Sequence, residues 1–366
     1  MLCPYSLSAP GGVQGQVTGL AAALRHDGHD VVVLAPADEG TDLGPDGPDL
    51  VRLGRAIAVP ANGSVAPVAL SPGAVRTALD AVRGGGFEVL HLHEPLVPGP
   101  GLACLVRCSL PMVGTFHRAG AGPGYRALGR VARGAAQRLA ARCAVSEEAA
   151  ATAASVLGDG APYEIVGNGI DTRRLLAATP WPTEGPTVLF VGRHEPRKGL
   201  SVLLAAAAAL GPDGPTLWVA GEGPDTERLR RRHPAGPRLA WLGRVGDDAL
   251  AARLAGAHAL CAPSVGGESF GVVLLEAMAA RTAVVASDIP GYAAVVDGHG
   301  VLVPAGDVGA WATALASVTA DAAAATGRCA PAALDAAAAH AARWSMPRVA
   351  ARYVEVYRRV ARSPGP

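Results

Sequence analysis

Short runs of aliphatic residues alternate with helical segments along this chain, and this alternation most restricts the folds open to it. Strand-like runs lie at 30–35, 87–93, 112–116, 142–145, 187–192, 216–220, 259–263 and 282–286. Helical patterns lie at 13–27, 125–141, 199–210 and 271–281. Near-continuous apolar strands separated by helices are typical of parallel sheets covered on both faces. We therefore predict an α/β fold.

The length of 366 residues suits two domains, each with its own core. The alternation is broken between 171 and 186, where Thr179-Pro180-Trp181-Pro182 interrupts any periodic pattern. We predict two Rossmann-like, doubly wound domains, at 1–170 and 171–345, with a C-terminal helix at about 346–361 returning to the first. Such sheets bind ligands at the carboxyl ends of their strands, so we expect a ligand cleft between the domains.

Composition and charge exclude several classes of function. The net charge is +1 and neither half is strongly basic, which argues against a nucleic-acid partner. No apolar run reaches the ~18 residues needed to span a bilayer and no signal segment opens the chain, so we expect a cytoplasmic protein. The six cysteines contain no Cys-x-x-Cys pair, which favours small buried side chains over disulfides or a zinc site.

The strongest functional pattern is GGESFGVVLLE, from Gly266 to Glu276. Glu268 lies in a glycine-rich turn and Glu276 about two helical turns later, which places both near one face. The turn opens a helix, whose free N–H groups would form an anion site for a diphosphate. The alternative is a capped helix with incidental acidic residues.

The same segment allows a second interpretation, because GESFG fits the G-x-S-x-G pattern of serine hydrolases around Ser269. That motif requires a strand that runs directly into the turn, whereas residues 263–266 intervene here. Asp288 and His299 would have to complete the triad. A serine hydrolase therefore remains an alternative function.

A second pattern, FVGRHEPRKG, places Arg193 and Lys198 after a predicted strand. Lys198 is the only lysine among 32 cationic residues. Two cations at the carboxyl end of a strand can face a pyrophosphate and stabilise charge as a sugar–phosphate bond breaks. The alternative is a solvated basic turn.

Weaker signals occur in the first domain. Gly11 and Gly12 precede a helix and would let backbone amides approach a phosphate, although a glycine pair often marks only a turn. His117 ends a strand and fits a buried hydrogen-bonding role as well as a site role. His91 and His93 lie on one strand face, but no third ligand follows at suitable spacing, so we predict no metal site.

Taken together, these residues resemble the GT4 family of retaining glycosyltransferases, which have the GT-B architecture of two Rossmann-like domains. The similarity covers nearly the whole chain and is carried by CPYS (3–6), PGGVQ (10–14), NGSVA (62–66), HLHEP (91–95), TFH (115–117), EPRKG (195–199) and the Glu268–Glu276 segment. It implies metal-independent transfer of a sugar from a nucleotide-diphosphate donor, without a cofactor. GDP-mannose is the favoured donor and an inositol phospholipid a candidate acceptor.

The resemblance also implies roles for individual residues on the donor side. The implied donor-binding residues are Gly11, Gly12, Arg193, Lys198, Val245, Glu268, Ser269, Phe270, Gly271, Val272 and Glu276. Glu268 would hold the hydroxyls of the transferred sugar and Glu276 the ribose of the nucleotide. Catalysis would rest on His117, beside the reacting bond, together with Arg193, Lys198 and Glu268.

The acceptor side, implied to contain Tyr5, Gln14 and Asn62, departs from the family pattern. Ala61 stands where the family has a tyrosine, and only Met1-Leu2-Cys3 precede Pro4, which indicates either a mis-set start or a truncated sheet. These departures motivate a third interpretation, a non-catalytic homologue that binds the donor.

The family's lysine-rich membrane-surface helix corresponds here to 71–85, which has only Arg76 and Arg83. Arg126, Arg130 and Arg133 are spaced to lie on one helix face and could partly replace the lost charge. A solvated face is the alternative. Peripheral contact with the inner face of the plasma membrane is therefore a further expectation.

Overall fold

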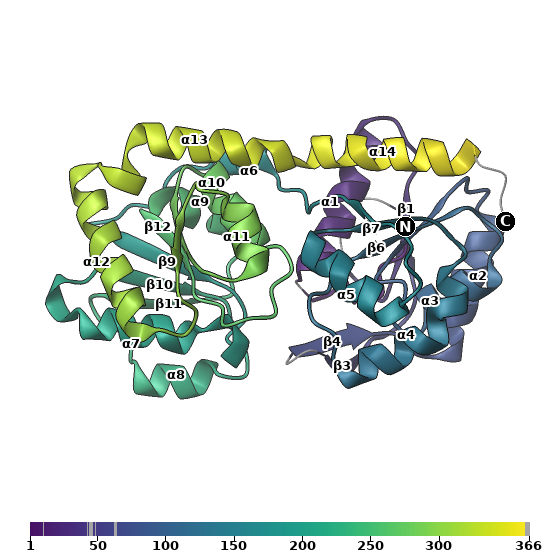
Figure 1. The fold of residues 1–366 in the computed structure, drawn as a ribbon, viewed down its shortest axis with the longest axis horizontal. Coiled ribbons are helices and arrows are strands. Elements are labelled where there is room, and N and C mark those ends of the chain that lie inside the picture. Colours follow the sequence, from purple (N-terminus) through teal and green to yellow (C-terminus); the bar gives the residue numbers. More distant parts are fainter. Residues whose placement is uncertain (10, 42, 44–46, 48, 62–63, 363–366) are drawn as a thin grey trace. The chain divides into compact units, whose positions relative to one another are not determined.

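The structure is a computed structural model that describes all residues except 10, 42, 44–46, 48, 62–63 and 363–366 (Figure 1). The chain divides into two compact units. Unit 1 comprises Met1–Gly169 and Met346–Pro366, and unit 2 comprises Ile170–Ser345. Each unit contains a parallel sheet covered by helices, which confirms the predicted α/β class.

The elements of unit 1 are β1 (Val32–Ala35), β2 (Asp49–Arg52), β3 (Ile57–Ala61), β4 (Ser64–Val68), β5 (Leu90–His93), β6 (Met112–Phe116), β7 (Leu139–Ala144), β8 (Glu164–Ile165), α1 (Gly12–His26), α2 (Pro72–Gly84), α3 (Pro100–Arg107), α4 (Pro123–Ala136), α5 (Glu147–Leu157) and α14 (Met346–Arg362). β5 to β8 pair in chain order, β1 pairs with β2, and β3 and β4 form an antiparallel hairpin.

Leu2 joins the two parallel parts of the unit 1 sheet. It forms single parallel bridges with Leu34 of β1 and Leu92 of β5. Its N–H donates to the carbonyl of His91 at 2.8 Å, and its carbonyl accepts from His93 at 3.0 Å. A single bridging residue therefore lies where a doubly wound sheet has its first strand.

α1 and α14 pack together over the unit 1 sheet, although more than 300 residues separate them in sequence (Figure 1). Val349, Tyr353, Val356 and Val360 of α14 are buried at helical spacing. They share one cluster with Val17, Leu20 and Leu24 of α1 and with Val33 and Val113 of the sheet. This amphipathic face explains why the final helix belongs to unit 1.

The predicted helix 125–141 was wrong at its C-terminal end. α4 ends at Ala136 and β7 begins at Leu139. Alanine-rich sequence favours helix by propensity, but β7 pairs with both β6 and β8, and tertiary pairing overrides propensity here. The buried guanidinium of Arg142 is compensated by Asp159 at 2.8 Å, which allows an arginine within this strand.

The elements of unit 2 are β9 (Thr187–Val191), β10 (Thr216–Ala220), β11 (Leu239–Gly243), β12 (Ala259–Ala262), β13 (Ala283–Ser287), β14 (Val301–Val303), α6 (Thr172–Ala177), α7 (Leu200–Ala209), α8 (Thr226–Arg232), α9 (Asp247–Gly256), α10 (Val272–Ala279), α11 (Pro290–Val296), α12 (Val308–Ala324), α13 (Pro331–Ala341) and the 3-10 turns η1 (Pro196–Lys198), η2 (Gly211–Asp213), η3 (Gly327–Cys329) and η4 (Ala342–Trp344). The parallel sheet has the order β11-β10-β9-β12-β13-β14. α7 and α12 cover it with a core that includes Leu203, Trp311 and Leu315.

Two further predictions from the sequence concerned membrane-spanning segments and the cysteines. In the described part of the chain, no helix is both long enough and apolar enough to cross a membrane. All six cysteines are free and buried, as predicted.

Candidate functional site

Two loops meet at the carboxyl edge of the unit 2 sheet. β9 neighbours both β10 and β12, so the chain winds outward from β9 in one direction and resumes on its other side at β12. Open α/β sheets bind ligands at such a switch point. The loop after β9 carries Arg193 to Lys198, and the loop after β12 carries Pro263 to Gly271. The two strongest sequence patterns therefore lie at one edge.

Gly199 brings the two loops into direct contact. It follows η1 with φ of 66°, the left-handed region that glycine adopts without strain. A Cβ at this position would lie 1.8 Å from the carbonyl oxygen of Pro263. Only glycine fits here, and it places Lys198 next to the loop that carries Glu268.

Glu268 is held by cations of the neighbouring loop. Its Oε1 lies 2.8 Å from Lys198 Nζ and 2.7 Å from Arg197 Nη1. The hydroxyl of Ser264 donates to the same oxygen at 3.4 Å and lies 2.9 Å from the hydroxyl of Tyr292. The side chain of Glu268 is only 12% exposed, so these donors compensate a largely desolvated carboxylate.

A second carboxylate, Glu195, organises the arginines. It is almost fully buried, with Arg193 Nε 2.8 Å from Oε1 and Arg197 Nε 3.2 Å from Oε2. The terminal nitrogens of Arg193 make no hydrogen bond with any residue that the structure describes, and its side chain is 46% exposed. Glu195 thus fixes Nε of Arg193, and the two terminal nitrogens of the guanidinium are available to bind an anion.

The glycine-rich turn before α10 also has a steric cause. Gly271 has φ of 92°, and a Cβ there would lie 2.7 Å from the ring of Tyr292. Ser269 and Phe270 precede it, and α10 begins at Val272 without a side-chain cap. No side chain therefore caps the opening amides of this helix, and the predicted anion site there stays a prediction.

Glu276 occupies a different environment from Glu268. It lies on α10, is partly buried, and makes no hydrogen bond with residues in the described part of the chain. Burial raises its pKa to about 7, while Arg174 opposes and Asp247 adds to this shift. Arg174 and Asp247 pair at 2.9 Å, which links α6 to the start of α9, just after the loop of Val245.

In unit 1, Gly11 and Gly12 open α1 as predicted, and both are exposed. The side chain of Gln14 lies beside Gly11, and its amide donates to the carbonyls of Ser6 and Ala9, each at 3.2 Å. This side chain therefore fixes the loop before α1 in addition to its predicted acceptor role.

Tyr5 and Asn62 are the other two residues that the sequence placed on the acceptor side. Tyr5 forms an antiparallel bridge with Val68, and burial raises the pKa of its phenol. Asn62 lies outside the described residues, so its predicted role stays a prediction.

His117 is bound on two sides by residues at the C-terminal end of β5. Its Nε2 lies 3.0 Å from His93 Nδ1, and its backbone N–H donates to Glu94 Oε1 at 2.6 Å. Burial lowers the pKa of His117 to about 4, so the imidazole is neutral at physiological pH. Glu94 has φ of 48°, a strained conformation for a non-glycine residue that functional sites tend to retain.

His91 has a structural role. Its Nδ1 and Nε2 each lie 2.7 Å from a hydroxyl, of Tyr357 and Thr115 respectively, and its ring stacks 4.1 Å from that of His93. The shared strand face predicted for the two histidines is present. Among the described residues, no three histidine, cysteine or acidic side chains form a group that could hold a metal ion.

The structure does not assemble the hydrolase alternative. Ser269 lies seven residues beyond the end of β12, not at a strand-to-helix elbow. No hydrogen bond joins its hydroxyl to a histidine within the described ranges, and His299 instead packs its ring on His340, 4.4 Å away. The strained strand-to-helix turn that exposes a serine nucleophile is therefore absent from this segment.

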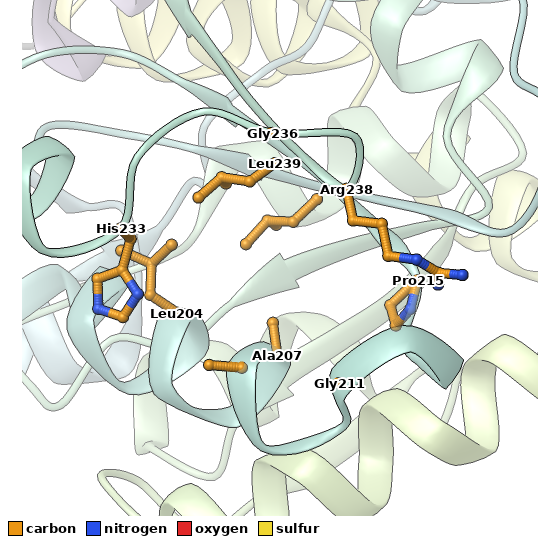
Figure 2. Close-up of a pocket in the computed structure, with 10 residues that line it drawn as sticks. Leu204, Ala207, Gly211, Pro215, His233, Gly236, Arg238 and Leu239 are labelled. Atoms are coloured by element: carbon orange, nitrogen blue, oxygen red, sulfur yellow. The ribbon is translucent and has the colours of Figure 1, made fainter.

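A pocket of about 260 Å³ lies elsewhere in unit 2 (Figure 2). Figure 2 shows aliphatic side chains such as Leu204 and Leu239 along its wall, with His233 and Arg238 at its margins. Pro215 precedes β10 and Arg238 precedes β11, so the pocket is at the amino ends of these strands. It is thus at the sheet edge opposite to the unit 2 loops that carry Lys198 and Glu268.

Sequence reasoning missed several residues that hold the site together. Arg197 and Glu195 are within the quoted EPRKG run, but their spacing gave no sign that they pair with Glu268 and Arg193. Ser264 and Tyr292 are 28 residues apart and carry no motif. Only the fold brings them to one carboxylate.

Comparison with protein families gives two matches that together cover most of the chain. Residues 10–174 match the family described as "Glycosyltransferase Family 4". Residues 185–321 match "Glycosyl transferases group 1".

Individual proteins show the same similarity. The chain is 40% identical over 331 residues to phosphatidyl-myo-inositol mannosyltransferase of Mycolicibacterium smegmatis, covering 88% of this chain and 84% of that protein. Its fold is similar to sucrose-phosphate synthase from Thermosynechococcus elongatus, with TM-score 0.78, 22% identity and coverage of 97% and 95%. It is also similar to Anabaena Alr3699/HepE in complex with UDP and glucose, with TM-score 0.77, 20% identity and coverage of 98% of each chain.

Proposed function

This chain belongs to glycosyltransferase family 4, and from that premise we propose that it transfers mannose from GDP-mannose to an inositol phospholipid. Its two Rossmann-like units have the GT-B architecture expected from the sequence. The proposal for donor and acceptor is supported by relatives named phosphatidyl-myo-inositol mannosyltransferase, which are similar over more than four-fifths of the chain.

The observation that carries the proposal is the cluster of Arg193, Lys198 and Glu268 at the switch point of unit 2. Cations and helix amides would bind the diphosphate, and a carboxylate beside them would accept hydrogen bonds from the hydroxyls of the sugar. Glu276 would accept hydrogen bonds from the ribose. The HepE structure, which contains UDP and glucose, supports a nucleotide-sugar site in this fold.

In the proposed reaction, the acceptor oxygen forms a bond to the anomeric carbon while the bond from that carbon to the diphosphate breaks. The proton of the acceptor hydroxyl passes to the departing phosphate on the same face, so configuration is retained. Arg193 and Lys198 stabilise the charge that develops on the leaving GDP. His117, as a neutral imidazole, can donate a hydrogen bond to the sugar without adding a charge.

We further propose peripheral contact with an anionic membrane through α4. Tyr125, Gly129, Ala132 and Ala136 form its buried face. Arg126, Arg130 and Arg133 are exposed on the other side, where Val131 is 83% exposed. α4 contains no acidic residue, so its outer face suits anionic lipid headgroups around a lipid acceptor.

The test is a transfer assay with purified protein, GDP-mannose and vesicles that contain phosphatidylinositol, with the product identified by mass spectrometry. We expect a monomannosylated inositol phospholipid and free GDP, and no product with Glu268→Ala. Donor binding without turnover on any inositol lipid would favour the non-catalytic interpretation. Turnover only with a UDP-sugar would replace the proposed donor.

A further inference from the structure

The two oxygens of the Glu268 carboxylate are used unequally. Arg197 Nη1, Lys198 Nζ and the Ser264 hydroxyl all converge on Oε1, at 2.7, 2.8 and 3.4 Å. Oε2 makes no hydrogen bond with any residue in the described part of the chain. Three donors on one oxygen fix the carboxylate plane and leave the other oxygen for a ligand.

Arg197 is itself fixed from the opposite side. Its Nε lies 3.2 Å from Oε2 of Glu195, which is almost fully buried and also holds Arg193 at 2.8 Å. A planar guanidinium that bridges two carboxylates has little freedom, unlike the flexible ammonium of Lys198. Arg197 is therefore the rigid partner of Glu268, and Lys198 the movable one.

Donor binding changes the charges around Glu268. The cluster has three cations, Arg193, Arg197 and Lys198, and two carboxylates, Glu195 and Glu268. A diphosphate that recruits Lys198 takes one counter-ion away from Glu268. A carboxylate that is mostly desolvated then needs its remaining partner to stay charged and oriented.

We infer that Arg197 is a positioning residue that holds Oε1 of Glu268, so that Oε2 faces the hydroxyls of the transferred sugar while Lys198 binds the diphosphate. This inference rests on the proposed function, because it assumes a nucleotide-diphosphate-sugar donor. It predicts a division of labour: Lys198 acts on the diphosphate of every ligand, whereas Arg197 matters only for ligands that carry the sugar.

Calorimetric titration with GDP and with GDP-mannose tests this division. We expect Arg197→Ala to weaken GDP-mannose binding and lower kcat by about ten- to a hundredfold, the effect of a lost charge-assisted hydrogen bond, with GDP binding within about twofold of wild type. Lys198→Ala should weaken binding of both ligands. Arg197→Lys should recover part of the loss, because it restores one charged donor.

Arg228→Ala is the matched control, because it removes an arginine of unit 2 that is 51% exposed and whose ion pair is with Asp225, outside the Glu195–Glu268 cluster. It should leave both affinities and kcat unchanged. Equal loss of GDP and GDP-mannose binding in Arg197→Ala would overturn the inference and make Arg197 a phosphate ligand. Wild-type behaviour of Arg197→Ala would also overturn it.

The fold and the donor are tested separately. Circular dichroism checks each variant, and if Arg197→Ala unfolds, the comparison of GDP with GDP-mannose in Arg197→Lys decides the question by the same criterion. Failure of the wild-type protein to bind any GDP-sugar would instead contradict the proposed function. A selective loss for a different nucleotide-sugar in Arg197→Ala would keep the inference with another donor.

Discussion

The ammonium of Lys198 lies 2.8 Å from Oε1 of Glu268, so the only lysine of the chain is paired with a carboxylate that is proposed to bind the sugar. The sequence suggested separate roles for these residues, one on the diphosphate and one on the sugar. Their contact means that donor binding must exchange one ion pair for another. The variants below separate the two roles.

Lys198→Ala should lower kcat/KM for the donor by about a hundredfold, or about 3 kcal/mol, comparable to the loss of one well-aimed oxyanion donor. Lys198→Arg should retain more activity but not all, because a planar fork does not replace a compact ammonium at a crowded phosphate. Steady-state kinetics and circular dichroism measure both. Near-wild-type turnover in Lys198→Ala would contradict the phosphate role and leave the lone lysine unexplained.

Glu268→Ala should abolish detectable transfer while the protein stays folded. The partners of this carboxylate, Arg197 and Lys198, are 27% and 21% exposed, so water can solvate them when it is removed. Glu268→Gln keeps the volume and should lose about 10²- to 10³-fold in kcat, because the charge that holds the sugar is gone. Product formation by mass spectrometry and thermal unfolding provide the readouts. Substantial transfer by Glu268→Ala would exclude the assigned sugar contact.

Donor affinity should rise with pH through the pKa of Glu276, which burial places at about 7. If only the carboxylate accepts the ribose hydroxyls, its ionised fraction grows about tenfold between pH 6 and pH 8, and Kd for GDP falls in proportion. Binding then releases a proton. Calorimetry in buffers of different ionisation enthalpy measures both effects, with Glu276→Gln as a pH-independent control. An equal slope in that variant would assign the titration to another group.

The same shift has a consequence for stability, with a defined sign. The folded protein binds more protons at Glu276 than the unfolded chain between about pH 4.5 and pH 7, because the folded pKa is the higher one. This residue therefore lowers the free energy of unfolding as pH rises through that window. Urea unfolding of wild type and Glu276→Gln should converge at low pH and diverge toward pH 8. Parallel curves would contradict the raised pKa.

EDTA should leave transfer intact, because the charge on the leaving diphosphate is proposed to be stabilised by Arg193, Lys198 and helix amides. Activity is compared before and after chelation, and again with Mg²⁺ or Mn²⁺ restored. A strict requirement for either ion would contradict this assignment and point to a metal bound with the donor.

Replacing Arg126, Arg130 and Arg133 with glutamine should reduce partitioning onto anionic vesicles. At about 1 kcal/mol for each cation near the surface, the three losses amount to somewhat more than about a hundredfold in vesicle affinity and should shrink at high salt. The matched control replaces Arg348, Arg352 and Arg358, which are exposed on α14, with glutamine. Co-sedimentation with and without phosphatidylinositol measures binding. Equal losses of vesicle binding in both triple variants would show that the effect depends only on the net charge of the protein.

The sequence by itself determined the kind of fold and the motifs that carry chemistry. Apolar runs such as Thr187–Val191 can be buried on both faces only in a parallel sheet, and glycines such as Gly199 mark turns that no other residue can adopt. The apolar runs and the turn glycines both depend on the chemistry of neighbouring residues, which can be read directly from the sequence. This is why the loops with Lys198 and Glu268 could be predicted before the structure.

Only the tertiary structure decided where each strand begins and ends, and which charged side chains pair with one another. Leu139 and Ala141 are compatible with helix by propensity, and pairing with β6 made them strand. Arg197 and Lys198 reach one oxygen of Glu268 because β9 and β12 are neighbours in the sheet, although about 70 residues separate these strands in sequence. Ion pairing depends on distance in space and on desolvation, and neither is encoded in the spacing of a motif.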